Sequence, residues 1–231
     1  MSRRPAARQS PDNLAATWQA ASVLLCYPDE TVIERLPLVQ RVADRLPADL
    51  GAPLRSTLDR LAGTPLERLQ EDYVATFDNR RRCSLFLTYF QFGDTRKRGV
   101  ALLRFKQAYL RSGYLLDDTE LPDHLCVVLE YGAQVDRERA WGLLLDHRAG
   151  LEVLRLALRD GSSVWSGAVE AVTASLPTLH GDERDVVRRL AEQGPPDEEV
   201  GMSPYDGSAF DAALVSTRAD LPMPTFSGAS R

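Results

Sequence analysis

Histidine and cysteine, the residues that most often bind metals or act as nucleophiles, are few and scattered in this chain. No histidine has a second histidine or a cysteine three or four residues away, and no two cysteines have the spacing of a zinc site. Glycine-rich phosphate loops and the serine motif of hydrolases do not occur either. We therefore expect no metal site, no cofactor and no catalytic centre, and we expect free, buried thiols without a lowered pKa. These residues are His124, His147, His180, Cys26, Cys83 and Cys126.

Cationic residues are dense in one part of the chain, although its net charge is −5. They occur at residues 80–82 and 96–98, and again at Arg104 and Lys106. Two interpretations are open. The residues can form a solvated helix face, or they can contact an anion or an acidic peptide, including the phosphate of a cofactor that a partner carries.

Asp123 and His124 combine an acid and an imidazole after Leu121 and Pro122, in what we expect to be the first turn of a helix. A structural explanation suffices for this pair, because an acid is favoured at the positive helix end and the imidazole can donate to a nearby carbonyl or carboxylate. His147 lies on a stripe of leucines, which favours a hydrogen-bonded histidine in the core or at the edge of a groove. We expect His180 in a loop.

Composition limits the class of protein. The chain has 231 residues, 44% of them hydrophobic, which can supply a sizeable core. Its negative net charge would repel nucleic acid, and its apolar runs are shorter than the ~20 residues that span a bilayer. Three arginines in the first ten residues are not followed by a signal-peptide core. We expect a cytoplasmic protein that does not insert into the membrane.

Apolar residues recur every three or four positions along most of the chain, which is the spacing of one helix face. We predict Asn13 as the N-cap of a first helix that ends before Pro28. A second helix is expected to start at Asp29 and to break or kink at Pro37. Thr64, followed by Pro65 and Glu67, has the pattern of a helix start. Further helices are expected at residues 54–62, 66–77, 96–111, 121–135, 139–160, 164–176 and 182–193.

Residues 84–92 are rich in aromatic and other β-prone residues, so a short buried strand and a buried helix are both open. We favour the helix because a lone strand has no partner. After residue 194 the composition turns to Pro, Gly, Ser and acids. We expect a flexible N-terminus at 1–12, a tail at 195–231 that is disordered, and between them, at 13–194, an all-α, single globular domain of eight or nine helices.

Ordered blocks of sequence between residues 73 and 130 resemble the NarJ family, a branch of the TorD-like chaperones of redox enzymes. The resemblance implies an all-helical fold that binds the N-terminal segment of the catalytic alpha subunit of respiratory nitrate reductase in its apo form. It also implies that the chaperone supports insertion of the molybdenum cofactor before membrane attachment. The family's Asp-His pair falls on Asp123 and His124. The blocks are residues 73–78, 81–85, 87–89, 93–96, 98–99, 101–109, 120–125 and 127–130.

We expect an apolar groove around Tyr89, Phe105, Tyr109 and Leu125 that takes one face of an amphipathic client helix. Asp123 and Glu130 are expected at its rim, where they would select a basic client, and the His124 imidazole is expected to titrate near neutral pH. We expect a monomer or weak homodimer. Alternatives are a chaperone for another molybdoenzyme of this class and a helical DNA-binding regulator or enzyme. The expected client-binding residues are Tyr89, Arg104, Phe105, Tyr109, Asp123, His124, Leu125 and Glu130.

Overall fold

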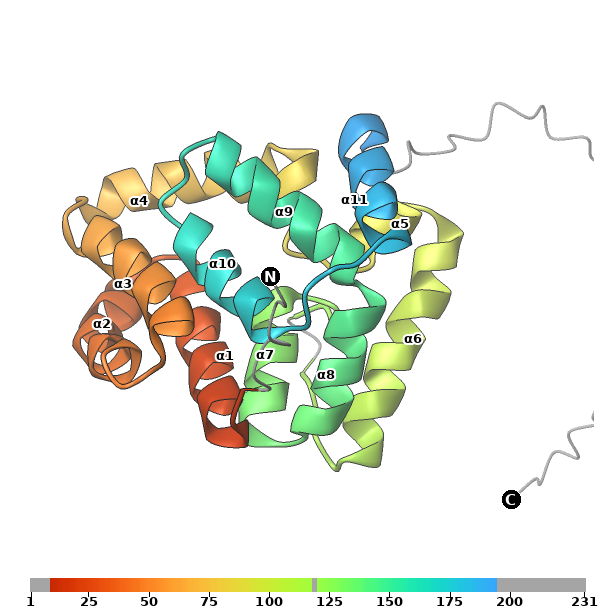
Figure 1. Ribbon diagram of the computed structural model, residues 1–231, viewed down its shortest axis with the longest axis horizontal. Helices are drawn as coiled ribbons and strands as arrows, with labels where there is room; N and C mark the ends of the chain where they lie inside the picture. The colour runs from red at the N-terminus through yellow and green to blue at the C-terminus, as the bar shows by residue number, and fades with distance from the viewer. Residues whose placement is uncertain (1–8, 118–119, 195–231) are drawn as a thin grey trace, which may run out of the picture. The chain divides into compact units, whose positions relative to one another are not determined.

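The computed structural model describes residues 9–117 and 120–194, and these residues form an all-α fold, as predicted (Figure 1). They contain 11 α-helices, more than the eight or nine expected, because one predicted helix is divided and a four-residue helix occurs. The expected disordered tail lies outside the described residues. The helices are α1 Pro11–Leu25, α2 Glu30–Ala43, α3 Ala48–Ala62, α4 Leu66–Tyr73, α5 Tyr89–Phe92, α6 Arg96–Arg111, α7 Leu125–Gln134, α8 Arg137–Asp146, α9 Arg148–Asp160, α10 Ser166–Ser175 and α11 Asp182–Gln193.

Helix starts follow local capping chemistry. Asp29 caps α2 as predicted, because its side chain accepts a hydrogen bond from the backbone N of Val32 at 2.7 Å. The cap of α1 is Ser10 instead of Asn13, so the helix begins inside the stretch expected to be flexible. Helix α2 continues through Pro37, and the predicted break does not occur.

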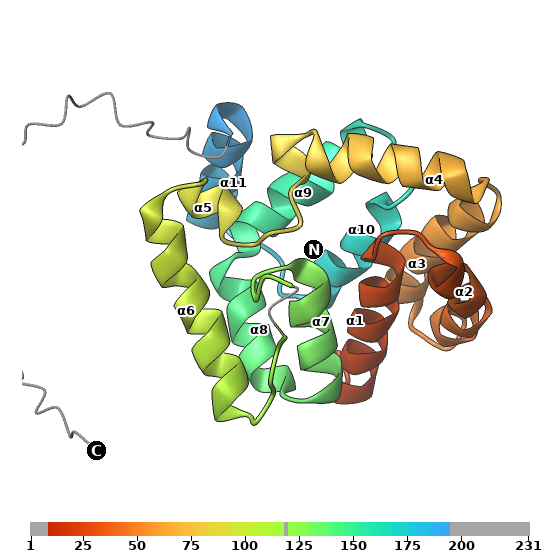
Figure 2. The same cartoon turned by 180° about the vertical axis from the view of Figure 1, so that it is seen from behind.

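The core is built around α1, which contacts α7, α10, α2 and α3 (Figures 1 and 2). Trp18 is fully buried, and its indole Nε1 donates to Ser175 Oγ on α10 at 2.9 Å. Helices α3 and α10 approach closely at Gly167, where an added Cβ would lie 2.0 Å from the backbone oxygen of Pro53. This small residue therefore sets the distance between the two helices.

Several predicted helices have other bounds in the structure. The helix expected at 54–62 begins at Ala48, and the one expected at 66–77 ends as an α-helix at Tyr73 and continues as a π-helix, Val74–Asp78. The expected helix at 139–160 is divided at His147 into α8 and α9, because the His147 ring packs on Phe105, with ring centroids 5.3 Å apart. The expected helix at 121–135 begins only at Leu125, because Asp123 turns its side chain into the core. Tertiary contacts decide these last two boundaries.

Residues 84–92 combine the two structures left open by the sequence. Phe86 forms an isolated antiparallel bridge with His124, and the chain then turns into α5. Within residues 9–117 and 120–194, no helix has the length and apolar character needed to cross a bilayer.

Candidate functional site

The bridge at Phe86 ties together two segments that are far apart in the sequence. The backbone N–H of Leu87 donates to the backbone carbonyl oxygen of Asp123 at 3.0 Å, and the backbone N–H of Leu125 donates to that of Leu85 at 2.8 Å. The chain at 84–88 thus lies alongside the start of α7. After the bridge at Phe86 the chain turns at Leu87 and Thr88 into α5.

Asp123 is buried completely. Its Oδ2 accepts two hydrogen bonds from Thr88, one from the backbone N–H at 3.1 Å and one from the side-chain Oγ1 at 2.5 Å. Arg98 Nη2 lies 3.8 Å from the same oxygen, while Arg98 Nη1 pairs with Asp94 at 2.8 Å. We call Thr88, Arg98, Asp123 and His124 the Asp123 cluster.

The Asp123 cluster holds unused hydrogen-bonding capacity. Eight buried side-chain N or O atoms of the described residues have no hydrogen-bond partner, and three of them belong to this cluster, with a fourth on Thr95 nearby in the chain. Unpaired buried polar groups are rare because each costs about 1–3 kcal/mol. A bound chain can use these atoms once the side chains that cover them move. The four atoms are Thr95 Oγ1, Arg98 Nη2, Asp123 Oδ1 and His124 Nδ1.

Two half-buried aromatic rings cover the Asp123 cluster. The Arg98 guanidinium lies 5.2 Å from the centroid of the Phe86 ring and 5.8 Å from that of Tyr89. Phe86 also meets the His124 ring edge-on at 5.2 Å, and Arg81 Nε donates to the Tyr89 hydroxyl at 2.9 Å. The surface above the buried carboxylate is therefore aromatic and cationic.

A cavity of about 570 Å³, with a largely apolar lining, lies beside Leu87. We call it the apolar groove. Leu87 and Phe90 line one part, His147 and the start of α9 line another, and α11 contributes Val186 and Leu190. Asp146 and Gln91 are exposed polar residues of its lining. Two consecutive residues therefore connect the two features, because Thr88 belongs to the Asp123 cluster and Leu87 lines the groove.

Burial lowers the pKa of both His124 and His147. Negative charges oppose this effect, from Glu120 at His124 and from Asp146 at His147, but desolvation is the larger cause. Both imidazoles are therefore neutral near neutral pH. The titration that we expected near neutral pH for His124 is displaced to more acidic pH.

The structure sorts the eight expected client-binding residues by accessibility. The buried ones cannot be reached in this conformation, and the Tyr109 hydroxyl instead donates to the Pro122 oxygen at 2.5 Å. Asp123 is consequently not a rim residue. Glu130 accepts from Gln134 within α7, and no contact connects it to the Asp123 cluster. Phe105, Tyr109, Asp123 and Leu125 are buried, Tyr89 and His124 are partly buried, and Arg104 and Glu130 are exposed.

Several residues of the site were not predicted as such. Arg98 belongs to the basic run, but the sequence did not distinguish it from its neighbours, which are exposed. Thr88 and Leu87 lie in the resemblance blocks without a predicted role. Val186 and Leu190 carried only the signal of an amphipathic helix.

The cysteines differ from the expectation in one respect. Cys26 and Cys126 share a side-chain hydrogen bond, which lowers the pKa of Cys26 and raises that of Cys126. Cys83 is buried, and burial raises its pKa. The prediction that no thiol has a lowered pKa is wrong for Cys26, because its neighbour lies on a helix distant in sequence.

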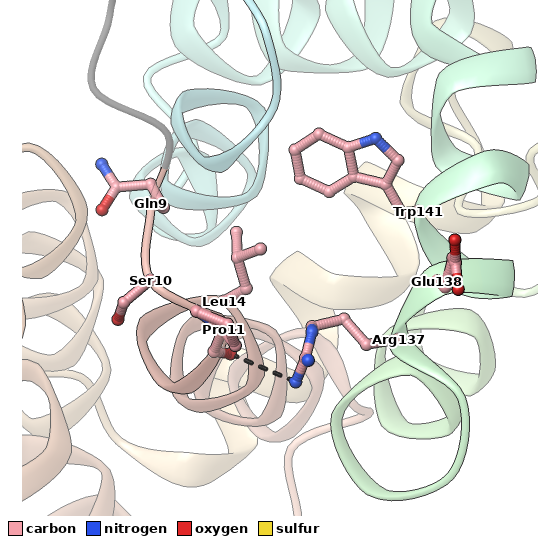
Figure 3. A pocket seen from close by; sticks show the side chains of 7 residues that line it. All are labelled: Gln9, Ser10, Pro11, Leu14, Arg137, Glu138 and Trp141. Atoms are coloured by element: carbon pink, nitrogen blue, oxygen red, sulfur yellow. Dashed lines mark hydrogen bonds between the residues drawn. The ribbon is translucent and has the colours of Figure 1, made fainter.

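A second cavity, of about 560 Å³, lies between the starts of α1 and α8 (Figure 3). Leu14 and Trp141 border it from the two helices, and Arg137 donates to the Pro11 oxygen at 3.5 Å. None of its lining residues belongs to the Asp123 cluster or neighbours one in the chain, whereas Leu87 of the apolar groove precedes Thr88. We therefore place the candidate site at the apolar groove, which adjoins the Asp123 cluster.

Comparison with known proteins identifies the family. The family described as nitrate reductase delta subunit matches residues 43–171. The probable nitrate reductase molybdenum cofactor assembly chaperone NarJ of Bacillus subtilis is 32% identical over 71% of this chain and 89% of its own length. NarJ of Escherichia coli is 33% identical over 63% of each chain. The nitrate reductase-like protein NarX of Mycobacterium tuberculosis is 38% identical over 71% of this chain, which spans only 25% of NarX.

A crystal structure shares the fold. It is a putative redox enzyme maturation protein from Archaeoglobus fulgidus, which is 22% identical, with a TM-score of 0.51, over 74% of this chain and 97% of that chain. The matched region 43–171 contains the Asp123 cluster and most of the apolar groove, but not α11. By the extent of these matches, the chain belongs to the nitrate reductase delta subunit family.

Proposed function

We propose that this protein is a cytoplasmic assembly chaperone of nitrate reductase, a binding protein without catalysis of its own, which holds the alpha subunit in its apo form while the molybdenum cofactor is inserted. The names of its relatives support the chaperone role in nitrate reductase maturation. The observation that carries the site is the apolar groove beside the Asp123 cluster. The bound segment is the N-terminus of the alpha subunit, as an amphipathic helix.

The apolar groove suits such a helix because it is apolar inside and polar at its edge. Leu190 is partly buried, whereas Leu87 and Phe90 are buried here and would contact the apolar face of the client once α11 shifts. Asp146 is exposed in the lining and takes the role first expected of Asp123, an acid that favours a basic client segment. Tyr89 lies next to Phe90 and adds an accessible aromatic anchor.

Helix α11 is the wall best able to move. Val187 is its only buried apolar residue among those described, whereas Val186 is 43% exposed. Elements that bury few apolar contacts open at the least cost in free energy. A client helix can therefore shift α11 outward and stay packed against Val186 and Leu190, without unfolding the core around α1.

Calorimetric titration of the full chain with a synthetic peptide from the alpha-subunit N-terminus tests this proposal. We expect saturable binding with a negative heat-capacity change, since apolar surface is buried. Tyr89→Ala and Val186→Ser should each weaken it by about tenfold, the effect of losing ~1.4 kcal/mol at an interface anchor. Tyr27→Ala and Leu38→Ser are matched controls, because both residues are about half exposed on other helices or loops.

The outcomes separate the site from the client. Binding that Tyr89→Ala and Val186→Ser leave unchanged would show that the apolar groove is misplaced. No binding by the folded protein would remove the alpha-subunit N-terminus as the client. Binding of the corresponding peptide from another molybdoenzyme with equal affinity would favour the broader chaperone role.

A further inference from the structure

Helix α6 carries charge of one sign. Its 16 residues include six Arg or Lys and no Asp or Glu, in a chain whose net charge is −5. Arg98 is largely buried in the Asp123 cluster, whereas the other five cations are exposed. Only one of the six is therefore explained by the candidate site. The exposed five are Arg96, Lys97, Arg104, Lys106 and Arg111.

The outward face of α6 also carries apolar residues at regular spacing. Val100 is 67% exposed, Leu103 53% and Leu110 61%. With Gln107 they follow one another at intervals of three, four and three residues, the spacing of the contact positions in a two-helix coiled coil. We call Val100, Leu103, Gln107 and Leu110 the α6 outer stripe. It lies opposite the buried face, which carries Ala101, Phe105 and Tyr109.

Cations flank the α6 outer stripe on both sides. Lys97, Arg104 and Arg111 recur every seven residues along one side, and Lys106 lies on the other, where coiled coils place the charges that select a partner. Figures 1 and 2 both show α6 at the edge of the helical region, with α8 beside its inner side. The α6 outer stripe is thus accessible along its length to an elongated partner.

A small cavity of about 100 Å³ adds an anchor point at the end of the α6 outer stripe. Lys106, Leu110 and Leu115 line it, and Leu115 is 80% exposed. Its size suits one aliphatic side chain. Such a pocket at the end of an apolar seam is typical of protein interfaces, in which a few inserted side chains dominate the binding free energy.

We propose that α6 docks an acidic amphipathic helix of a partner protein, in addition to the client site at the apolar groove. Aliphatic residues of the partner pack on the α6 outer stripe, and its flanking carboxylates pair with the five exposed cations. Pairing of α6 with α6 of a second copy is disfavoured, because the two helices would bring like charges together. A bilayer fits less well, because Gln107 in the middle of the α6 outer stripe would have to enter the apolar phase.

Fluorescence anisotropy of a labelled probe peptide tests the proposal with the full chain. The probe is a synthetic helix of about three heptads with Leu at the contact positions and Glu at the flanking positions. We expect it to bind more weakly as salt is raised, while a peptide with Lys in place of Glu does not bind. The variants Leu103→Ser/Leu110→Ser and Lys97→Glu/Lys106→Glu should each lower the affinity at least tenfold.

Leu38→Ser, at a residue 54% exposed on α2, should leave the affinity for the probe unchanged. All four altered positions of α6 are exposed, so the variants should keep the circular dichroism of the wild type. The proposal is wrong if the probe does not bind, or if neither double variant weakens it. It is also wrong if the chain instead binds phosphatidylglycerol vesicles through Leu103 and Leu110. Titration with the alpha-subunit peptide stays unchanged in Leu103→Ser/Leu110→Ser, so failure here leaves the proposed client standing.

Discussion

Replacing Asp123 by alanine should destabilise the protein strongly, because the carboxylate is a structural support of the site. It is fully buried and accepts two hydrogen bonds from Thr88, and each hydrogen bond to a charged group contributes about 1.5–3 kcal/mol. Asp123→Ala leaves the Thr88 N–H unpaired and removes a negative charge 3.8 Å from Arg98, whose side chain is only 15% exposed. We expect a loss of about 3–5 kcal/mol in the free energy of unfolding.

Urea unfolding followed by circular dichroism measures this loss. With a slope of about 2 kcal/mol per molar urea, the midpoint should fall by roughly 2 M. Asp123→Asn keeps an oxygen that can accept from Thr88 and should lose only about 1–2 kcal/mol. Asp94→Ala is the matched control, because this residue pairs with the same Arg98 but is 47% exposed, so its loss should stay below ~1 kcal/mol.

A stability of Asp123→Ala within about 0.5 kcal/mol of the wild type would refute this reasoning. If such a stable variant no longer bound the alpha-subunit peptide, Asp123 would contact the client directly after a local opening of the site. A variant that unfolds and loses the peptide together supports the structural role. The two readouts therefore separate support of the site from contact with the client.

Three further outcomes follow from single residues. Gly150→Ala should lower the free energy of unfolding by about 1–3 kcal/mol in urea titrations, because the added Cβ would lie 2.8 Å from the Phe90 ring; wild-type stability would show that Phe90 can move aside. Burial lowers the pKa of His147, so the unfolded chain binds the proton more tightly than the folded chain. The free energy of unfolding should therefore fall as the pH drops below about 6.5. Urea unfolding at several pH values measures this loss, which should be smaller in His147→Gln. Iodoacetamide followed by mass spectrometry should modify Cys26 before Cys83, since a thiol hydrogen bond lowers the pKa of the first and burial raises that of the second; the reverse order would contradict the assignment.

Local chemistry explains what was predicted correctly from the sequence. Helices α6 and α11 have the predicted bounds, and Asp29 caps α2. In each case the signal lies within a few residues, as a cap, a glycine after the last turn or an apolar repeat. Such signals are present before any tertiary contact forms. Asn13 shows their limit, because Ser10 offers an equivalent cap three residues earlier.

The candidate site depends on contacts that local signals do not contain. The sequence placed Asp123 and His124 in a helix, but the structure places them before it, because Thr88 is bonded to Asp123 across 35 residues. It also marked Phe105 as a groove residue. The structure buries that ring, and the accessible part of the groove is formed by residues of α9 and α11 beside it.

The sequence by itself therefore determined the helical class, the bounds of helices such as α6 and α11, and the family, since these depend on residue types and spacing along the chain. Only the tertiary structure decided which side of each helix is accessible. In α6, apolar residues occur on both sides, with Phe105 inward and Leu103 outward, so their spacing cannot tell the core from a docking face. The neighbouring helices settle it, because burial depends on what packs against a side chain and not on its position in the helix.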